Sequence, residues 1–297
     1  MPFLNESHSM QRMTSRTEIH RFRVRKLVEL LAVTGMVLCA AVSIFFLLAI
    51  LGYVVYRGAS SIDWEFLTAL PLPPGEVGGG IANALIGSVL VVGCATLLAM
   101  PIGLGAAVFV NEFPSARLGR AVRFMAEVLT GVPSIVVGLF AYALVVQPMG
   151  SFSGLSGSVA YAIIMVPIVL ITSHEAFRLV PPSLREASLA LGVPKWRTII
   201  GIVLPVSSKA LITGGVLAIS RALGEAAPML FTAFGNPFWN LNLGKPIATV
   251  PMLIYTYATG PYEDWHRKAW AASFVLMMVV LATSVMTRAF LRGKAHE

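Results

Sequence analysis

Arg221 and Glu225 are two charged side chains within an apolar stretch, residues 219–231, and their types and spacing suit anion chemistry. Because they are four residues apart, a helix would place them on one face. A charge inside an apolar span is costly and usually faces a cavity, a partner or a substrate path. The planar guanidinium of Arg221 can bind a tetrahedral oxyanion through two hydrogen bonds, and Glu225 can hold the guanidinium in place or accept the proton of a monohydrogen phosphate. The alternative is a salt bridge between helices that does not contact substrate.

Glu127 is the next candidate for a substrate path, because it begins another apolar stretch. A solvated or helix-capping role is the alternative there. Small residues follow it at Thr130–Ser134 and at Gly138. Such residues usually allow close helix packing, but they can also leave a span unwound around a substrate.

A basic loop lies between two apolar runs and contains Glu186–Pro205, with the sequence EASLALGVPKWRTIIGIVLP. We predict a short helix over 183–191, a left-handed turn at Gly192 and a second helix that starts at Pro194. Leu184, Ala187 and Leu191 would share one face of the first helix. An apolar face held at a membrane surface suits docking in a groove of a cytosolic partner, with Glu186 as the orienting charge. The alternative is an ordinary amphipathic surface hairpin.

The composition of the chain indicates an integral membrane protein. Of its 297 residues, 57% are hydrophobic and 12% are charged, and the mean hydropathy is +0.79. Soluble domains carry about 25% charged residues. Runs of about 20 apolar residues are long enough to cross a bilayer as helices. We therefore predict an all-α protein with six transmembrane helices, at 27–55, 82–109, 124–147, 156–175, 206–231 and 269–290.

The distribution of basic residues predicts the orientation of these spans. Most of the 22 Lys and Arg residues fall in segments that are cytoplasmic if the N-terminus is cytoplasmic, as the positive-inside rule requires. The opposite side would hold Arg57, Lys245, Arg267 and Lys268. Both termini and the loop with Glu186 are then cytoplasmic. The net charge of +8 is explained by this arrangement, so we do not expect nucleic-acid binding.

The sequence lacks the residue patterns that nucleotide binding, zinc binding and nucleophilic catalysis require. No GxxxxGK[ST] motif is present, so ATP-driven work requires a separate ATPase that binds ATP and Mg²⁺. His174 and Glu175 lack the second histidine of a zinc-binding helix, and we predict no metal site. There is also no pairing of a nucleophile with a base. We therefore predict that the chain has no catalytic residues and no cofactor of its own.

The Glu186–Pro205 stretch resembles the cytoplasmic coupling loop of permeases of ABC importers, the EAA…G…LP motif. Together with three further stretches, it makes the chain similar to the PstA-type permease subunits of bacterial phosphate importers, a branch of the type I importer family. The resemblance covers some three-quarters of the chain. The stretches are LTGVPSIVVGLFAY (129–142), LREASLALGVPKWRTIIGIVLP (184–205), RALGEAAPMLFT (221–232) and a C-terminal segment with Ile254, Tyr255 and Ala269–Ala271.

The resemblance implies a multi-pass subunit of the bacterial inner membrane with a five-helix importer core. It implies these partners: a second, different permease subunit, two cytosolic ABC ATPase subunits, an extracytoplasmic phosphate-binding protein and phosphate itself. It also implies that Arg221 and Glu225 are the charged residues linked to phosphate passage, whereas Glu127 is a substrate-path candidate from its position in the sequence alone. The implied ATPase-docking residues are Glu186, Ala187, Leu191, Gly192, Leu204 and Pro205. The sequence departs from the plain motif at Ser188, where alanine is usual.

The expected organisation follows from the spans and the resemblance. A basic cytoplasmic tail occupies 1–26, and a first transmembrane helix with an outer loop occupies 27–81. The permease core extends over 82–290 and contains the coupling hairpin at 181–205, and a cytoplasmic C-terminal tail occupies 291–297.

Three alternatives to this function remain open. The chain can be a permease for another tetrahedral oxyanion, such as sulfate or molybdate, or the sister phosphate permease subunit. It can also be a membrane scaffold that holds a cytosolic regulator on the same hairpin, which would not need Arg221. A secondary transporter is disfavoured, because inverted repeats with interrupted helices are not apparent.

Overall fold

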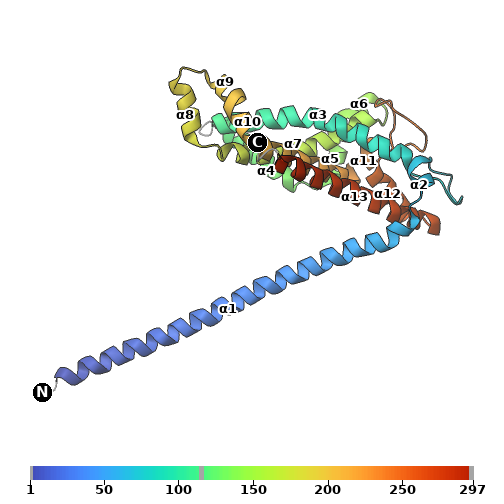
Figure 1. Cartoon of the computed structure of the whole chain (residues 1–297). Coiled ribbons are helices and arrows are strands. Elements are labelled where there is room, and N and C mark those ends of the chain that lie inside the picture. Colours follow the sequence, from blue (N-terminus) through green and yellow to red (C-terminus); the bar gives the residue numbers. More distant parts are fainter. Residues whose placement is uncertain (1–2, 114–116, 294–297) are drawn as a thin grey trace. The chain divides into compact units, whose positions relative to one another are not determined.

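The computed structural model describes residues 3–113 and 117–293, and every element in these ranges is helical (Figure 1). The chain divides into two compact units, one up to Tyr56 and one from Arg57 onward. The first unit belongs to a single helix, α1 (Phe3–Gly58). A candidate membrane span, Arg25–Ser61, begins within α1 and contains the predicted first span.

The second unit contains the remaining candidate spans. They are α3 (Ala82–Glu112), α7 (Gly154–Arg178), the run from α9 through α10 (Lys195–Leu223), and the larger part of α13 (Glu263–Gly293). With α1, these are five helices long and apolar enough to cross a membrane among the residues described. A bent pair, α4 (Arg117–Gly131) followed by α5 (Ser134–Ala141) and its continuation to Met149, raises the number to six if it is counted as one span. The all-helical fold and the number of spans match the prediction.

The third predicted span, 124–147, is broken rather than a single helix, as the alternative of an unwound span at Thr130–Ser134 allowed. The two halves meet at an angle of 109°. Pro133 lacks a backbone N–H and disfavours a helical conformation at Val132, and Gly131 adds freedom just before it. Beyond the break, Pro133 caps α5 by accepting a hydrogen bond from the Val136 amide at 2.9 Å. A π-helical turn (η2, Tyr142–Val146) and a short α6 (Gln147–Met149) complete this second half.

The fifth span was also predicted as one helix, over 206–231, and this prediction was wrong. α10 (Leu204–Leu223) ends at Gly224, and a separate short helix, α11 (Ala227–Thr232), begins after it. Glu225 therefore lies between two helices rather than on the face of one. The buried Tyr161 of α7 stabilises the break, because its hydroxyl donates a hydrogen bond of 2.7 Å to the Glu225 carbonyl.

α7 lies at the centre of the unit and contacts α3, α4, α5, α10 and α11. Its buried Tyr161, Met165 and Val169 pack with small side chains of α3 and α10. Small residues bring these helices close together. A Cβ at Gly103 of α3, for example, would stand 2.7 Å from the Val169 side chain.

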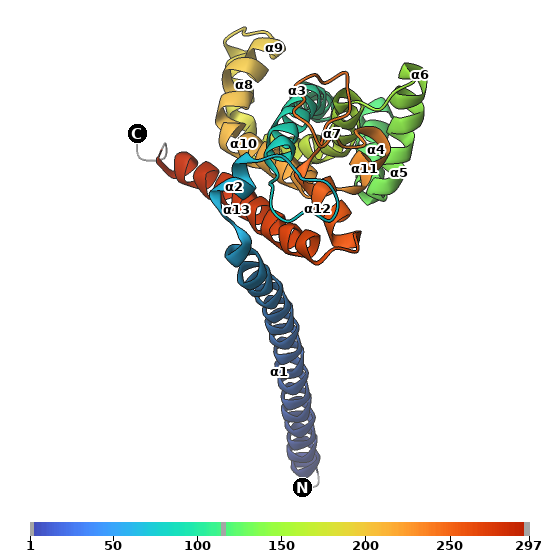
Figure 2. The same cartoon turned by 90° about the vertical axis from the view of Figure 1, so that its right-hand side faces the viewer.

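The two ends of the unit carry different elements (Figures 1 and 2). One end holds α8 (Pro182–Ala190) and α9 (Lys195–Thr198), which form a hairpin that continues through a π-helical stretch (η3, Ile199–Val203) into α10. The opposite end holds α2 (Trp64–Thr68) and α12 (Val250–Thr259), with the turn η1 (Ala59–Ser61) before α2. Of the predicted C-terminal tail, residues 294–297 lie outside the described part of the chain, and α13 extends to Gly293.

Candidate functional site

Arg221 lies beside the break in the third span. It lines a small cavity together with residues from both sides of the α4–α5 break and two residues near the middle of α7. The full lining is Leu129, Thr130, Val132, Ser134, Val137, Ile164, Ile168 and Arg221. The structure thus brings together two features that the sequence suggested separately, the charged residue and the interrupted small-residue stretch.

The cavity holds about 20 Å³, which is room for about one water molecule. A tetrahedral oxyanion with four oxygens needs several times this space, so this cavity does not hold one in the conformation described here. The Arg221 side chain is nevertheless 47% exposed. Its guanidinium therefore sits at an open face of this chain rather than sealed within it.

Arg221 and Glu225 form a loose ion pair. Nη2 of Arg221 lies 3.8 Å from Oε1 of Glu225, although the helix ends between them. This distance is too long for a hydrogen bond, so Glu225 does not occupy the donors of the guanidinium. The pair can hold Arg221 in place by charge while those donors face another acceptor.

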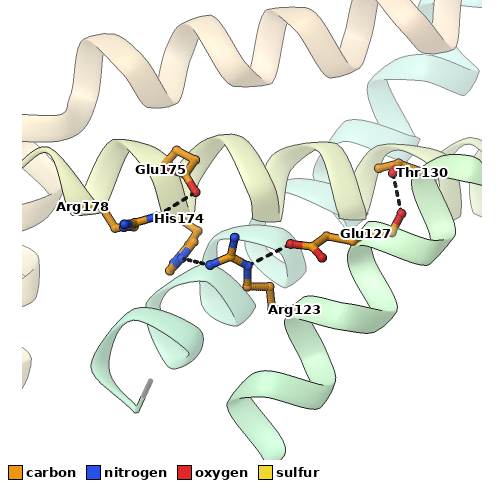
Figure 3. Close-up of polar contacts among 6 residues, drawn as sticks. All are labelled: Arg123, Glu127, Thr130, His174, Glu175 and Arg178. Atoms are coloured by element: carbon orange, nitrogen blue, oxygen red, sulfur yellow. Dashed lines mark hydrogen bonds and ion pairs between the residues drawn. The ribbon is translucent and has the colours of Figure 1, made fainter. Parts of the chain in front are cut away.

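Glu127 lies in α4 and interacts with Arg123, one turn earlier in the same helix. Its carboxylate accepts a hydrogen bond from Nε of Arg123 at 2.9 Å, and Nη1 of Arg123 lies 3.4 Å from Nε2 of the buried His174 (Figure 3). The Thr130 hydroxyl donates to the Glu127 carbonyl at 2.7 Å. Glu127 does not line the cavity that Arg221 lines, but Thr130 one turn later does.

The hairpin of α8 and α9 has the geometry predicted from sequence. Gly192 has a φ of +77°, the left-handed conformation, and α9 begins directly after Pro194. Glu186 and Ala187 are exposed, and the Leu191 side chain is 84% exposed, so these residues are available to a partner. Leu204, by contrast, is half-buried against the core beneath the hairpin, and Pro205 begins α10 at the surface.

Sequence reasoning missed two polar contacts that hold this hairpin. The hydroxyls of Ser188 and Thr198 lie 2.9 Å apart and both residues are buried, so the serine that departs from the motif joins α8 to α9. Nη1 of Arg185 donates to Oε1 of Glu112 at 2.6 Å and connects α8 to α3. Nothing in the sequence pairs residues that are 73 positions apart. The available signal was an arginine directly before Glu186 in the predicted docking helix.

Comparison with known proteins places the sequence among transport permeases. Residues 99–294 match the family described as binding-protein-dependent transport system inner membrane component. The sequence is 41% identical over 254 residues to the phosphate transport system permease protein PstA of Yersinia pestis, covering 85% of this chain and 86% of that protein. It is 35% identical over 273 residues to PstA 1 of Mycobacterium tuberculosis H37Rv, covering 90% of this chain and 88% of the relative.

Solved structures show the same fold at low sequence identity. An inward-facing MetNI methionine ABC transporter chain superposes with a TM-score of 0.62 at 15% identity, covering 72% of this chain and 95% of that one. A chain of a bacterial alginate ABC transporter gives a TM-score of 0.62 at 14% identity, covering 86% of this chain and 92% of that one. The matching family, the spanning helices and this fold agree on a multi-pass protein of the plasma membrane. The chain therefore belongs to the binding-protein-dependent transport system inner membrane components and, within them, to the PstA permeases.

Proposed function

We propose that the chain is the transmembrane permease subunit of an ATP-driven importer of inorganic phosphate and forms half of its translocation path. The substrate class is supported by curated relatives that are named as phosphate permeases and align over most of the chain. The observation that carries the path is the position of Arg221 beside the break between α4 and α5. Broken helices present free backbone groups, and within a membrane these are tolerated where they line a cavity or a path.

Arg221 is the residue that would bind the phosphate, and Glu225 would orient it. The guanidinium offers a planar set of donors that matches two phosphate oxygens. Its exposure and the small size of the cavity support a path completed by another subunit, because this chain alone encloses too little space. We therefore propose a heterodimer with a second, different permease subunit. Glu127 would act further along the path, through its contact with Arg123 rather than in the Arg221 cavity.

The hairpin at 181–205 would connect this path to ATP hydrolysis. We propose that Glu186, Ala187, Leu191 and Gly192 dock on one of two cytosolic ABC ATPase subunits, which supply the ATP and Mg²⁺ chemistry that this chain lacks. Leu204 and Pro205 would fix the hairpin to the bundle. Both termini would be cytoplasmic, and an extracytoplasmic phosphate-binding protein would deliver its ligand at the end that carries α2 and α12.

Two related functions compete with this proposal. Arg221 would bind sulfate or molybdate as well, but only monohydrogen phosphate offers a proton that Glu225 can accept. The sister phosphate permease would share the same motifs. The identity to PstA relatives over 85% or more of the chain favours the PstA assignment.

The test is uptake of labelled phosphate in cells whose own subunit is deleted, complemented with wild type, Arg221→Ala or the control Arg178→Ala. Arg178 lies in an exposed ion pair with Glu175, away from the cavity. Assembly of each complex is checked by co-purification of the partner subunits, and labelled sulfate is measured in parallel. We expect Arg221→Ala alone to abolish phosphate uptake with assembly intact. Normal uptake in this variant would overturn the role of Arg221, and uptake of sulfate instead of phosphate would overturn the substrate.

A further inference from the structure

Arg185 links the docking hairpin to two other helices through a single side chain. Its Nη1 donates to Oε1 of Glu112 at 2.6 Å, and its Nη2 donates to the Phe177 carbonyl at 3.1 Å. With its amide oxygen turned toward Arg185, Asn111 also accepts from Nη1 and Nη2, at 3.2 and 3.0 Å. The ion pair is largely shielded, because the side chains of Arg185 and Glu112 are 23% and 19% exposed. Screening by solvent is therefore weaker here than for a surface pair.

The position of Glu112 at the C-terminal end of α3 does not stabilise that helix. It is the last residue of α3, where the helix dipole disfavours a carboxylate. Arg185 compensates that cost and, at the same time, donates to the Phe177 carbonyl in the last turn of α7, which also accepts a hydrogen bond from the Val180 amide at 3.3 Å. These contacts connect α8 to the ends of α3 and α7.

The hairpin is continuous with α10 through η3, but the helix α8 itself has few other contacts with the bundle. In the described part of the chain, Ser188 is the one buried residue of α8, and its hydroxyl faces Thr198 of α9 rather than the bundle. Among the described residues, the polar contacts that join α8 directly to α3 are those of Arg185.

α3 can carry a force applied to α8 across the whole unit. Its 31 residues extend over roughly 46 Å at 1.5 Å per residue. At its far end, Nδ2 of Asn83 donates to the Asn236 carbonyl at 2.6 Å, and Oγ of Ser88 accepts from the amide of Val250, the first residue of α12, at 2.8 Å. One continuous helix, with Pro101 in its interior, thus joins the hairpin to the opposite end of this unit.

We infer that the Arg185–Glu112 ion pair is the joint through which movement of the docking hairpin reaches α3 and, through α3, the far end that carries α12. This inference rests on the proposed docking of an ATPase at the hairpin. The inference assigns different roles to two adjacent residues of α8. Glu186 faces the partner, and Arg185 faces the bundle. Arg185 and Glu112 are positioning residues, since neither touches substrate or nucleotide.

The experiment uses the complete transporter, with all its subunits and the binding protein, in proteoliposomes. Three quantities are measured for each variant: the amount of bound ATPase subunit, the rate of ATP hydrolysis, and the phosphate transported per ATP hydrolysed. The variants are Arg185→Met, Glu112→Gln, the double variant and Arg185→Lys. The control is Arg178→Met, which removes an exposed ion pair with Glu175 at the same end of the bundle.

We expect Arg185→Met and Glu112→Gln to keep their ATPase subunits and to transport roughly tenfold less phosphate per ATP, a change within the range typical of coupling between two sites. The double variant should be no worse than the more damaged single variant, because both remove the same interaction. Arg185→Lys should recover part of the loss, and Arg178→Met should behave as wild type.

Unchanged phosphate transport per ATP in Glu112→Gln, with the ATPase bound, would overturn the inference even if Arg185→Met failed to assemble. Loss of the ATPase from Arg185→Met combined with normal coupling in Glu112→Gln would also overturn it, and would place Arg185 in the docking surface. A different result would contradict the docking proposal itself, namely normal binding of the ATPase subunits to the Glu186→Lys variant.

Discussion

The hydroxyl oxygens of Ser188 and Thr198 lie 2.9 Å apart in the buried angle between α8 and α9, and each residue is at most 5% exposed. This contact sets the angle of the hairpin together with the hydrogen bond from the Val193 amide to the Ser188 carbonyl, at 3.2 Å. A buried hydroxyl that loses its partner costs about 1 kcal/mol or more.

Ser188→Ala and Thr198→Val should therefore each lower the melting temperature of the purified transporter, because each removes the hydrogen bond between the two hydroxyls. Thr198→Val leaves the Ser188 hydroxyl without this partner, and Ser188→Ala leaves the Thr198 hydroxyl with a longer hydrogen bond of 3.5 Å to the Pro194 carbonyl. The double variant should lose less than the sum of the two single losses, since it removes both partners at once. Thermal unfolding followed by tryptophan fluorescence measures the three shifts. Strictly additive shifts would mean that the two hydroxyls do not interact.

Gly192→Val should uncouple ATP hydrolysis from phosphate uptake. The φ of +77° at Gly192 costs a residue with a Cβ roughly 1–2 kcal/mol, and a β-branched residue adopts it least readily. The strain would change the direction of α9. Gly201→Val is the matched control, because neither glycine has an atom within 4 Å of its built Cβ and only Gly192 has a positive φ.

Uptake and ATPase activity are measured on both glycine variants. Gly192→Asn should retain more uptake than Gly192→Val, since asparagine tolerates the left-handed conformation. Equal uptake in all of these variants would show that the turn conformation is unimportant for coupling.

Glu186→Lys should weaken the association of the ATPase subunits. Glu186 is exposed on the outer face of α8, so reversing its charge changes a partner surface without disturbing packing. Glu76→Lys makes the same charge change in an exposed residue of the loop before α3, at the opposite end of the chain's second unit, and serves as the control. Co-purification of the ATPase from detergent-solubilised membranes gives the result, and undiminished recovery with Glu186→Lys would argue against docking at this helix.

Two glycines of α3 should respond in opposite directions to alanine. A Cβ at Gly87 would collide with the backbone carbonyl of Ala248, whereas Gly93 is exposed and has no atom within 4 Å of such a Cβ. Gly87→Ala should therefore destabilise the protein, and Gly93→Ala should leave it unchanged or stabilise it by up to about 1 kcal/mol through helix propensity. The melting temperatures of the two variants, measured side by side, decide this. A neutral Gly87→Ala would mean that α3 and the Ala248 segment do not approach so closely.

The sequence was enough to predict the helical membrane fold and the hairpin, because both depend on local signals. Apolar runs of sufficient length identify the spans. Gly192 with the nearby prolines identifies the turn, and the structure has its left-handed conformation. The helix breaks were only half foreseen. The Thr130–Ser134 stretch was noted as one that can unwind, whereas the end of α10 at Gly224 was not predicted. Whether such residues interrupt a span depends on neighbours, such as the hydrogen bond that Tyr161 donates to Glu225.

The contacts between distant segments could not be predicted in this way. Arg185 and Glu112 looked like ordinary basic and acidic residues at the ends of apolar runs, and only the folded chain brings them to 2.6 Å. Glu127 is a similar case. Its place at the start of an apolar stretch made it a substrate-path candidate, and the fold adds its hydrogen bond with Arg123, which the sequence did not predict.

The 47% exposure of the Arg221 side chain has a consequence for biogenesis. In an unassembled subunit this cation would face lipid or a wet defect in the bilayer, at a cost of about 2.5–3.5 kcal/mol on insertion scales. The same exposed face that would bind a partner subunit therefore exposes a charge to the bilayer when that subunit is missing. We expect an orphan copy of this chain to be poorly retained in the membrane and removed by quality-control proteases, so that its abundance in the cell follows the supply of the subunit that covers Arg221.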